Sequence, residues 1–127
     1  MRTLAVEIVR LDPGEIELAM PYNGAYTQQD GFMHAGIITT ALDTACGYAA
    51  FSLMPADAAV LTVEFKTNLI APAKGDSFSF RAHVIKSGKT LTVCDARAFA
   101  LEVGKERLIA TMTGTLIAIF KGGGIAN

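Results

Sequence analysis

The sequence predicts an α+β fold in which an antiparallel sheet of about six strands wraps around one long central helix. The first observation behind this prediction is a single helical pattern, which follows two strand-like stretches and precedes four more. The second is that the helical segment carries only one charged residue, Asp43, as expected of a helix enclosed by a sheet. At 127 residues the chain is predicted to form one domain over 1–127, because this length supports one core.

The N-terminal half is predicted to contain a hairpin and then the helix. Strands at 3–10 and 14–20 flank a turn with Pro13 at its second position. Turn formers interrupt the next stretch, and helical spacing then runs from 35 to 54, where Pro55 is expected to end the helix. One stripe of this helix is apolar and is predicted to be buried: Ile38, Ala41, Leu42, Ala45, Cys46, Ala49 and Leu53.

The C-terminal half alternates between apolar and polar residues in a way that is typical of strands. Four strands are expected, at 59–70, 77–86, 90–103 and 107–120. They are separated by turn signals at 72–76, 87–89 and 104–106. The tail at 121–127 is expected to be mobile, because three consecutive glycines are entropically costly to order.

Composition narrows the classes of partner. Hydrophobic residues make up 51% of the chain and charged residues 18%, which predicts a further buried face and hence a homodimer or a dimer of dimers. A formal net charge of −1 argues against nucleic acid and membrane surfaces as partners. The N-terminus does not have a signal-peptide pattern, and no apolar run reaches the roughly 18 residues of a membrane span, so a cytoplasmic location is expected.

Several residues are interpreted as structural. Cys46 and Cys94 form no C-x-x-C pair and are assigned to core packing. His83 has no acidic or thiol partner at ligand spacing, so it is assigned a structural or solvent-facing role and no metal is expected. The segment SGKT at 87–90 is not a phosphate-binding P-loop, because the first glycine of that motif is absent.

Asp43 requires an explanation, because burying a carboxylate without partners is costly. It is either a structural residue hydrogen-bonded to nearby hydroxyls of Thr39, Thr40 or Thr44, or a general base or nucleophile. Asp43 alone does not decide between these roles.

His34 at the start of the helix suggests that the site is shared between subunits. It lies nine residues before Asp43, which on a straight helix is roughly 13 Å of rise and half a turn out of phase. If both residues serve one site, His34 of one subunit must meet Asp43 of another. The helix N-terminus at Ala35 and Gly36 offers backbone N–H groups suited to an oxyanion, and Gly36 would leave room for a substrate carbonyl.

Three segments carry a family resemblance: Gln28-x-x-Gly31-x-x-His34-Ala35-Gly36 followed by Asp43, TVEFKTNLIAPAKGD at 62–76, and AHVIKSGKTLTVCDARA at 82–98. Together they resemble the PaaI-like hotdog-fold acyl-CoA thioesterases, from about residue 28 to residue 118 and in the same order of elements. The most specific parts are the spacing from His-x-Gly to Asp and the turn at 72–76. The resemblance implies a hotdog fold and hydrolysis of an acyl-CoA thioester without a bound cofactor, since coenzyme A is part of the substrate.

The resemblance also implies roles for single residues. Asp43 would act as base or nucleophile, and the backbone N–H of Ala35 would polarise the thioester carbonyl. His34 would orient this turn and contact the thioester. Gln28 would hold the attacking water or the carboxylate, and Thr62 would reach the carboxylate of the neighbouring subunit.

Coenzyme A is expected along the subunit interface, with Gly88, Lys89 and Thr90 near its phosphates, again by resemblance. Two positions depart from the family pattern. Ala35 replaces the usual Gly and would be strained if the turn needed a positive φ, and Gln28 replaces the usual Asn.

Two other functions remain open from the sequence: a hydratase or dehydratase on the same fold, and an acyl-CoA binding or sensing module without catalysis. The acyl group is also open, with aromatic and short- or medium-chain groups all compatible. Tyr48, Phe51 and Met54 could bound an acyl tunnel, although core packing is favoured for at least two of them.

Overall fold

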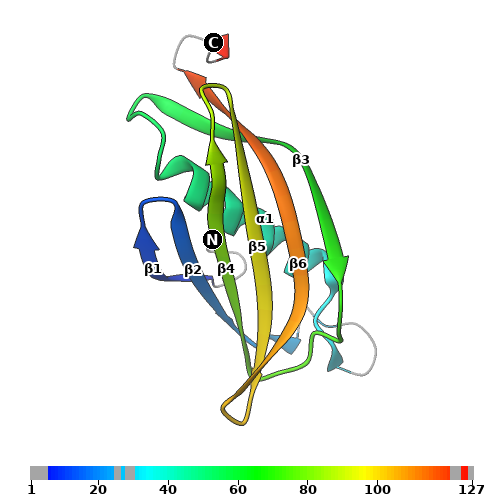
Figure 1. Cartoon of the computed structure of the whole chain (residues 1–127). Helices are drawn as coiled ribbons and strands as arrows, with labels where there is room; N and C mark the ends of the chain where they lie inside the picture. The colour runs from blue at the N-terminus through cyan, green and yellow to red at the C-terminus, as the bar shows by residue number, and fades with distance from the viewer. Residues whose placement is uncertain (1–5, 25–26, 28–30, 121–123, 126–127) are drawn as a thin grey trace.

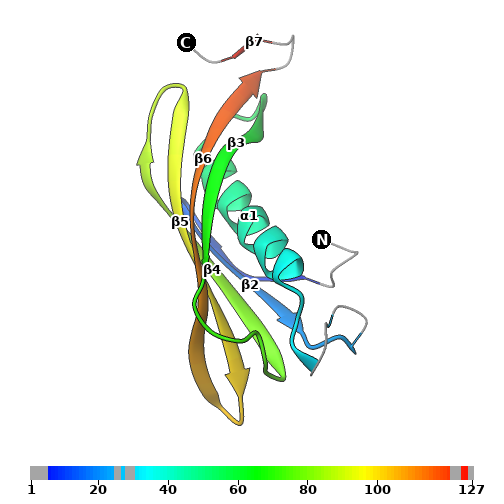
Figure 2. The same cartoon turned by 90° about the vertical axis from the view of Figure 1, so that its right-hand side faces the viewer.

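The computed structural model describes residues 6–24, 27, 31–120 and 124–125, and it confirms the predicted fold class. A curved antiparallel sheet carries one helix along its inner face (Figures 1 and 2). The elements are β1 (Glu7–Asp12), β2 (Glu15–Pro21), α1 (Ala35–Phe51), β3 (Ala58–Leu69), β4 (Ser77–Ser87), β5 (Leu91–Glu102), β6 (Lys105–Phe120) and β7 (Gly124–Ile125). The strand order is β1-β2-β4-β5-β6-β3, and the short β7 pairs with β6.

The core lies between α1 and the inner face of the sheet. The predicted apolar stripe is buried except at Leu53, which is 42% exposed beyond the end of the helix. Most helix residues that face the sheet are alanines, so the helix can pack closely against it. Phe78 and Phe80 of β4 fill the space opposite and are fully buried.

The helix ends at Phe51, three residues earlier than the sequence predicts. Leu53 and Met54 donate to the carbonyls of Ala50 and Phe51, three residues back, so the chain tightens instead of continuing the α-helix. The Ser52 hydroxyl donates to Ala49 and accepts from the Gly14 N–H at 2.8 Å. The β1–β2 turn therefore fixes the end of the helix, and this contact is invisible in local sequence.

Two other boundaries differ from the prediction. The β5–β6 turn is centred on Val103 and Gly104, which both have positive φ values of 51° and 75°, so β6 already begins at Lys105. The expected mobile tail falls mostly outside the described residues, but Gly124–Ile125 forms a short strand with β6.

Strand β3 forms one edge of the sheet and lies beside α1. Its register with β6 shifts between Thr62 and Glu64, where Val63 forms a bulge. Thr62 pairs with Leu116, and Phe65 pairs with Gly114. Leu116 and Gly114 are buried on the inner face of β6, and paired residues lie on the same face of a sheet. The bulge therefore places Thr62 and Phe65 on the same side of the sheet. This edge strand therefore presents polar and apolar residues beside the helix.

Candidate active site

Asp43 lies in the middle of α1, and β3 supplies its partner. The Thr62 hydroxyl of the same chain donates to Asp43 Oδ1 at 2.9 Å. Both side chains are half-buried and line an open cavity of about 510 Å³ between the helix and the first half of β3. The carboxylate is thus held in a fixed position while it remains accessible from the cavity.

The hydroxyls of Thr40 and Thr44 in α1 are not the partners of Asp43. The Thr40 hydroxyl donates to the Gly36 carbonyl at 2.8 Å, and the Thr44 hydroxyl donates to the Thr40 carbonyl at 2.9 Å. These bonds run along the helix, as is common for threonine on a helix surface. Of the three threonines that could have made Asp43 structural, these two bond to the backbone instead.

The N-terminus of α1 is capped by His34. Its backbone is extended, with φ −63° and ψ 136°, and its Nδ1 accepts from the Gly36 N–H at 3.0 Å. A Cβ on Gly36 would lie 3.2 Å from Nδ1, so glycine allows the imidazole to fold over the turn. The expectation that the Gly36 N–H is open for a substrate is therefore wrong, because the histidine occupies it.

The Ala35 N–H is open as far as the described residues go: none of them accepts a hydrogen bond from it. The first N–H groups of the helix with backbone acceptors are those of Ile37 and Ile38, which both donate to the His34 carbonyl. Ala35 is not among the residues with positive φ, so the alanine in place of the family's glycine introduces no backbone strain. It lines a second cavity of about 260 Å³, together with Leu69 at the far end of β3.

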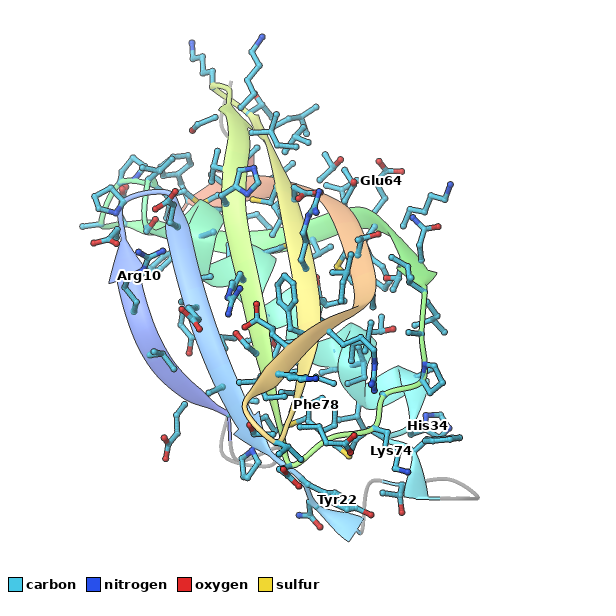
Figure 3. All side chains as sticks on the ribbon, turned by 60° about the horizontal axis from the view of Figure 1, so that its bottom comes forward. Arg10, Tyr22, His34, Glu64, Lys74 and Phe78 are labelled. Atoms are coloured by element: carbon cyan, nitrogen blue, oxygen red, sulfur yellow. The ribbon has the colours of Figure 1, made fainter. Side chains whose placement is uncertain are left out.

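The structure does not bring the two halves of the predicted site together within one chain. Asp43 and Ala35 line different cavities, and eight residues of helix separate them by about 12 Å. His34 lies at the edge of the molecule, at the beginning of the helix, as Figure 3 shows.

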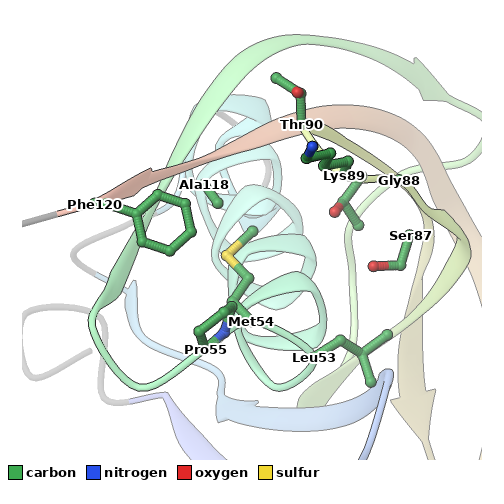
Figure 4. Close-up of a pocket in the computed structure, with 10 residues that line it drawn as sticks. Leu53, Met54, Pro55, Ser87, Gly88, Lys89, Thr90, Ala118 and Phe120 are labelled. Atoms are coloured by element: carbon green, nitrogen blue, oxygen red, sulfur yellow. The ribbon is translucent and has the colours of Figure 1, made fainter. Parts of the chain in front are cut away.

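Gly88, Lys89 and Thr90 lie in the β4–β5 turn, away from Asp43. They line a third cavity of about 460 Å³ at the C-terminal end of α1, whose other walls include Met54 and Phe120 (Figure 4). Gly88 has a structural reason for its identity, because an added Cβ would lie 2.7 Å from the Leu91 carbonyl oxygen. Within one chain, this turn and Asp43 do not share a cavity.

Thr62 and Gln28 were both expected at this site. Thr62 was expected to reach the carboxylate of a neighbouring subunit, whereas it bonds to Asp43 of its own chain because β3 lies directly beside α1. Gln28 lies outside the described residues. Sequence reasoning missed Gly47, which lines the Asp43 cavity. The available signal was a glycine one helical turn after Asp43 and on the same face of the helix.

The residues interpreted as structural behave as predicted. Cys46 and Cys94 are free, buried thiols, and Cys94 Sγ lies 3.6 Å from the Cys46 carbonyl oxygen. A hydrogen bond with the Cys94 side chain and burial both raise the pKa of Cys46, so its thiol stays protonated. His83 is exposed on β4. The described part of the chain contains no helix long and apolar enough to cross a bilayer.

Comparison with known proteins identifies the family. The Thioesterase superfamily matches residues 30–106. A thioesterase family protein from Silicibacter pomeroyi of known structure is 60% identical, with a TM-score of 0.94 over 95% of this chain and 89% of that one. A Saccharolobus solfataricus protein provisionally named an esterase is 32% identical over 90% of this chain and 73% of its own length.

The fold is also that of the Escherichia coli PaaI protein from the phenylacetic acid degradation operon. That structure has a TM-score of 0.83 at 22% identity and covers 98% of this chain and 86% of its own. The thioesterase family and the hotdog fold expected from the sequence motifs are confirmed. The chain belongs to the thioesterase superfamily and is a thioester hydrolase with the hotdog fold.

Proposed function

We propose that this protein hydrolyses acyl-CoA thioesters that carry a small aromatic or a short- to medium-chain acyl group, with Asp43 as general base or nucleophile. The observation that carries the proposal is the half-buried Asp43 carboxylate, which faces an open cavity and is held at 2.9 Å by Thr62. A carboxylate in this setting is oriented and still able to reach a ligand.

The oxyanion of the reaction is assigned to the Ala35 N–H of the partner subunit. This donor is open among the described residues and stands at the positive end of a helix dipole. A well-placed donor of this kind stabilises a transition state by about 3–4 kcal/mol. Because Ala35 and Asp43 of one chain are about 12 Å apart along the helix, each active site needs two subunits.

Strand β3 supports a dimer of this kind. It is an edge strand. Four residues of the strand and the residue that follows it are large, apolar and about half exposed: Leu61, Val63, Phe65, Leu69 and Ile70. Such an edge is a template for pairing with another strand. Thr62 lines the cavity that contains Asp43, and Leu69 lines the cavity that contains Ala35. Antiparallel pairing of two β3 strands, centred between Phe65 and Lys66, would bring each Thr62 opposite Leu69 of the partner subunit.

Hydrolysis of the thioester can then follow either of two routes. Asp43 can take a proton from a water whose oxygen attacks the carbonyl carbon, after which the C–S bond breaks and the coenzyme A sulfur takes up a proton. Alternatively, Asp43 attacks the carbonyl carbon itself, the thiolate leaves, and water hydrolyses the mixed anhydride. Both routes give a carboxylic acid and a free thiol, and neither requires a bound metal or cofactor.

The remaining roles are carried by the family resemblance. Gln28 would position the water or the carboxylate, His34 would hold the oxyanion turn through Gly36, and Lys89 with Gly88 and Thr90 would contact phosphates of coenzyme A. The exposed ammonium of Lys89 at the rim of its cavity is compatible with that role. Two buried thiols that remain unpaired fit the reducing cytoplasm.

The deciding experiment is thiol release from a panel of aromatic and aliphatic acyl-CoAs by the wild type and by Asp43→Asn. We expect kcat to fall at least 10²-fold in the variant while acyl-CoA affinity is retained. Asp76→Asn, the same chemical change at an exposed position outside these cavities, is the matched control and should keep wild-type rates.

Each result separates the functions that the sequence left open. A wild type that binds acyl-CoA without releasing thiol would identify a binding module, and addition of water across an enoyl-CoA would identify a hydratase. Because Ala35 is not strained, its replacement of the family's glycine gives no reason to favour a non-catalytic module. Full turnover in Asp43→Asn would exclude Asp43 as the base or nucleophile.

A further inference from the structure

Gly47 lies inside α1, four residues before its last residue, Phe51, and within a helix glycine is the poorest helix former apart from proline. At two other positions in the chain, packing explains the glycine. A Cβ on Gly36 would crowd the His34 ring at 3.2 Å, and one on Gly75 would lie 2.8 Å from the Leu101 carbonyl oxygen. A Cβ on Gly47 would meet no described atom within 4 Å. Packing within the chain therefore does not require glycine at this position.

The open space at Gly47 belongs to the Asp43 cavity. Gly47 follows Asp43 by one helical turn, which places the two on the same face of α1 about 6 Å apart. Beyond Gly47 the same cavity is walled by Tyr48 and Phe51 from the helix and by Val60 from β3. Phe51 lies eight residues after Asp43, so this part of the cavity extends about 12 Å along the helix.

The two directions away from Asp43 differ in polarity. Towards the N-terminus of α1 the neighbouring exposed residue is Thr40, three residues before Asp43, whose hydroxyl and carbonyl suit a chain that contains amide groups. Towards the C-terminus the cavity wall begins with Thr44, directly beside Asp43, and from Tyr48 onward it is aromatic and aliphatic. The reacting carbonyl carbon must lie about 3–3.5 Å from the attacking atom. That atom is either an Asp43 carboxylate oxygen or the oxygen of a water bound to Asp43. The apolar acyl group then fits the C-terminal side, and the pantetheine arm leaves in the other direction.

We infer that Gly47 determines acyl specificity: the acyl group of the substrate lies across the bare backbone at Gly47 and ends between Tyr48 and Phe51. This inference rests on the proposed function and makes it narrower. The substrate class is a medium-chain acyl-CoA or an aryl-acyl-CoA, whose apolar part extends at least one helical turn beyond the carbonyl. Acetyl-CoA would be too short to use this surface.

The test is a series of variants at this position, Gly47→Ala and Gly47→Leu, assayed for kcat and KM with straight-chain acyl-CoAs from acetyl to decanoyl and with one aryl-acyl-CoA. For Gly47→Leu we expect kcat/KM to fall at least tenfold for the long and aromatic substrates, with less than a threefold change for acetyl-CoA. Gly47→Ala should give a smaller shift in the same order. Its thermal midpoint should equal or exceed that of the wild type, because alanine is the better helix former.

Thr40→Leu is the matched control, since it places the same leucine side chain on the same helix on the other side of Asp43. We expect it to change all acyl lengths by one common factor. Equal losses for every substrate in Gly47→Leu, or dissociation of the dimer in light scattering, would overturn the inference and assign the space to the partner subunit. A wild type without turnover on any acyl-CoA would instead refute the proposed function itself, so the two failures can be told apart.

Discussion

Replacing Ala35 with proline would remove one N–H group from the proposed oxyanion site and leave the rest of the helix intact. Ala35 is the first residue of α1, after the cap His34. Proline is well suited to this first position, because its fixed φ is helical and the missing N–H is unpaired there anyway. The preceding residue must be extended, and His34 already has φ −63° and ψ 136°. The N–H that is lost has no acceptor among the described residues.

The expected effect on stability is therefore small, less than about 1 kcal/mol in the free energy of unfolding. Loss of one oxyanion donor lowers kcat by about 10²–10³-fold, and we expect KM to change much less. The assay is thiol release under saturating acyl-CoA, with circular dichroism melting of the same samples. Ala35→Gly keeps the N–H and should retain wild-type kcat. A folded Ala35→Pro enzyme with wild-type kcat would refute the assignment of this group to the oxyanion.

Three further predictions concern the shared site, the carboxylate and the thiols. Ala35→Pro and Asp43→Asn are each expected to be inactive, but a mixture of the two that is unfolded and refolded together should regain about one quarter of wild-type activity. Half of the refolded dimers are mixed, and each mixed dimer has one intact site out of two. No recovery would place the whole site in one chain. Thr62→Val should lower kcat/KM about tenfold, because a hydrogen bond to a charged group is lost, whereas Thr62→Ser should stay near the wild type; an active Thr62→Val would show that the carboxylate does not depend on this bond. Cys46 and Cys94 are both fully buried, and the Cys94 hydrogen bond together with burial raises the pKa of Cys46. A thiol reagent at pH 8 should therefore label neither cysteine until guanidinium is added, because neither is accessible, and rapid labelling of the native protein would contradict the buried positions.

Local periodicity was sufficient to predict the helix, the main strands and the order of layers. The apolar stripe of α1 and the alternation of β4 and β5 repeat at the spacing of their own element, so no distant contact is needed to recognise them. Asp43 could likewise be recognised from the sequence of the helix alone, because it is the only charged residue there.

Features that depend on contacts distant in sequence could not be predicted. The helix ends at Phe51 because Ser52 meets Gly14, 38 residues away. Thr62 reaches Asp43 because β3 is the edge strand beside α1 and keeps Thr62 on the inner face just before the bulge. The sequence pattern predicts which face of the sheet a side chain lies on only while side chains alternate between the two faces with a period of two residues. A bulge interrupts this period.

The same edge strand connects both halves of the proposed site. Its first half lines the cavity that contains Asp43, and its last residue, Leu69, lines the cavity at Ala35. The strand runs antiparallel to a second copy of itself in any two-fold β3 pair, so the first half of each strand necessarily meets the second half of the other. In the proposed dimer, a carboxylate and an oxyanion donor that are held apart by α1 within one subunit would thus be brought opposite each other between two. In this arrangement a substitution that prevents β3 from pairing should abolish turnover even though Asp43, Thr62 and Ala35 all keep their places in the chain.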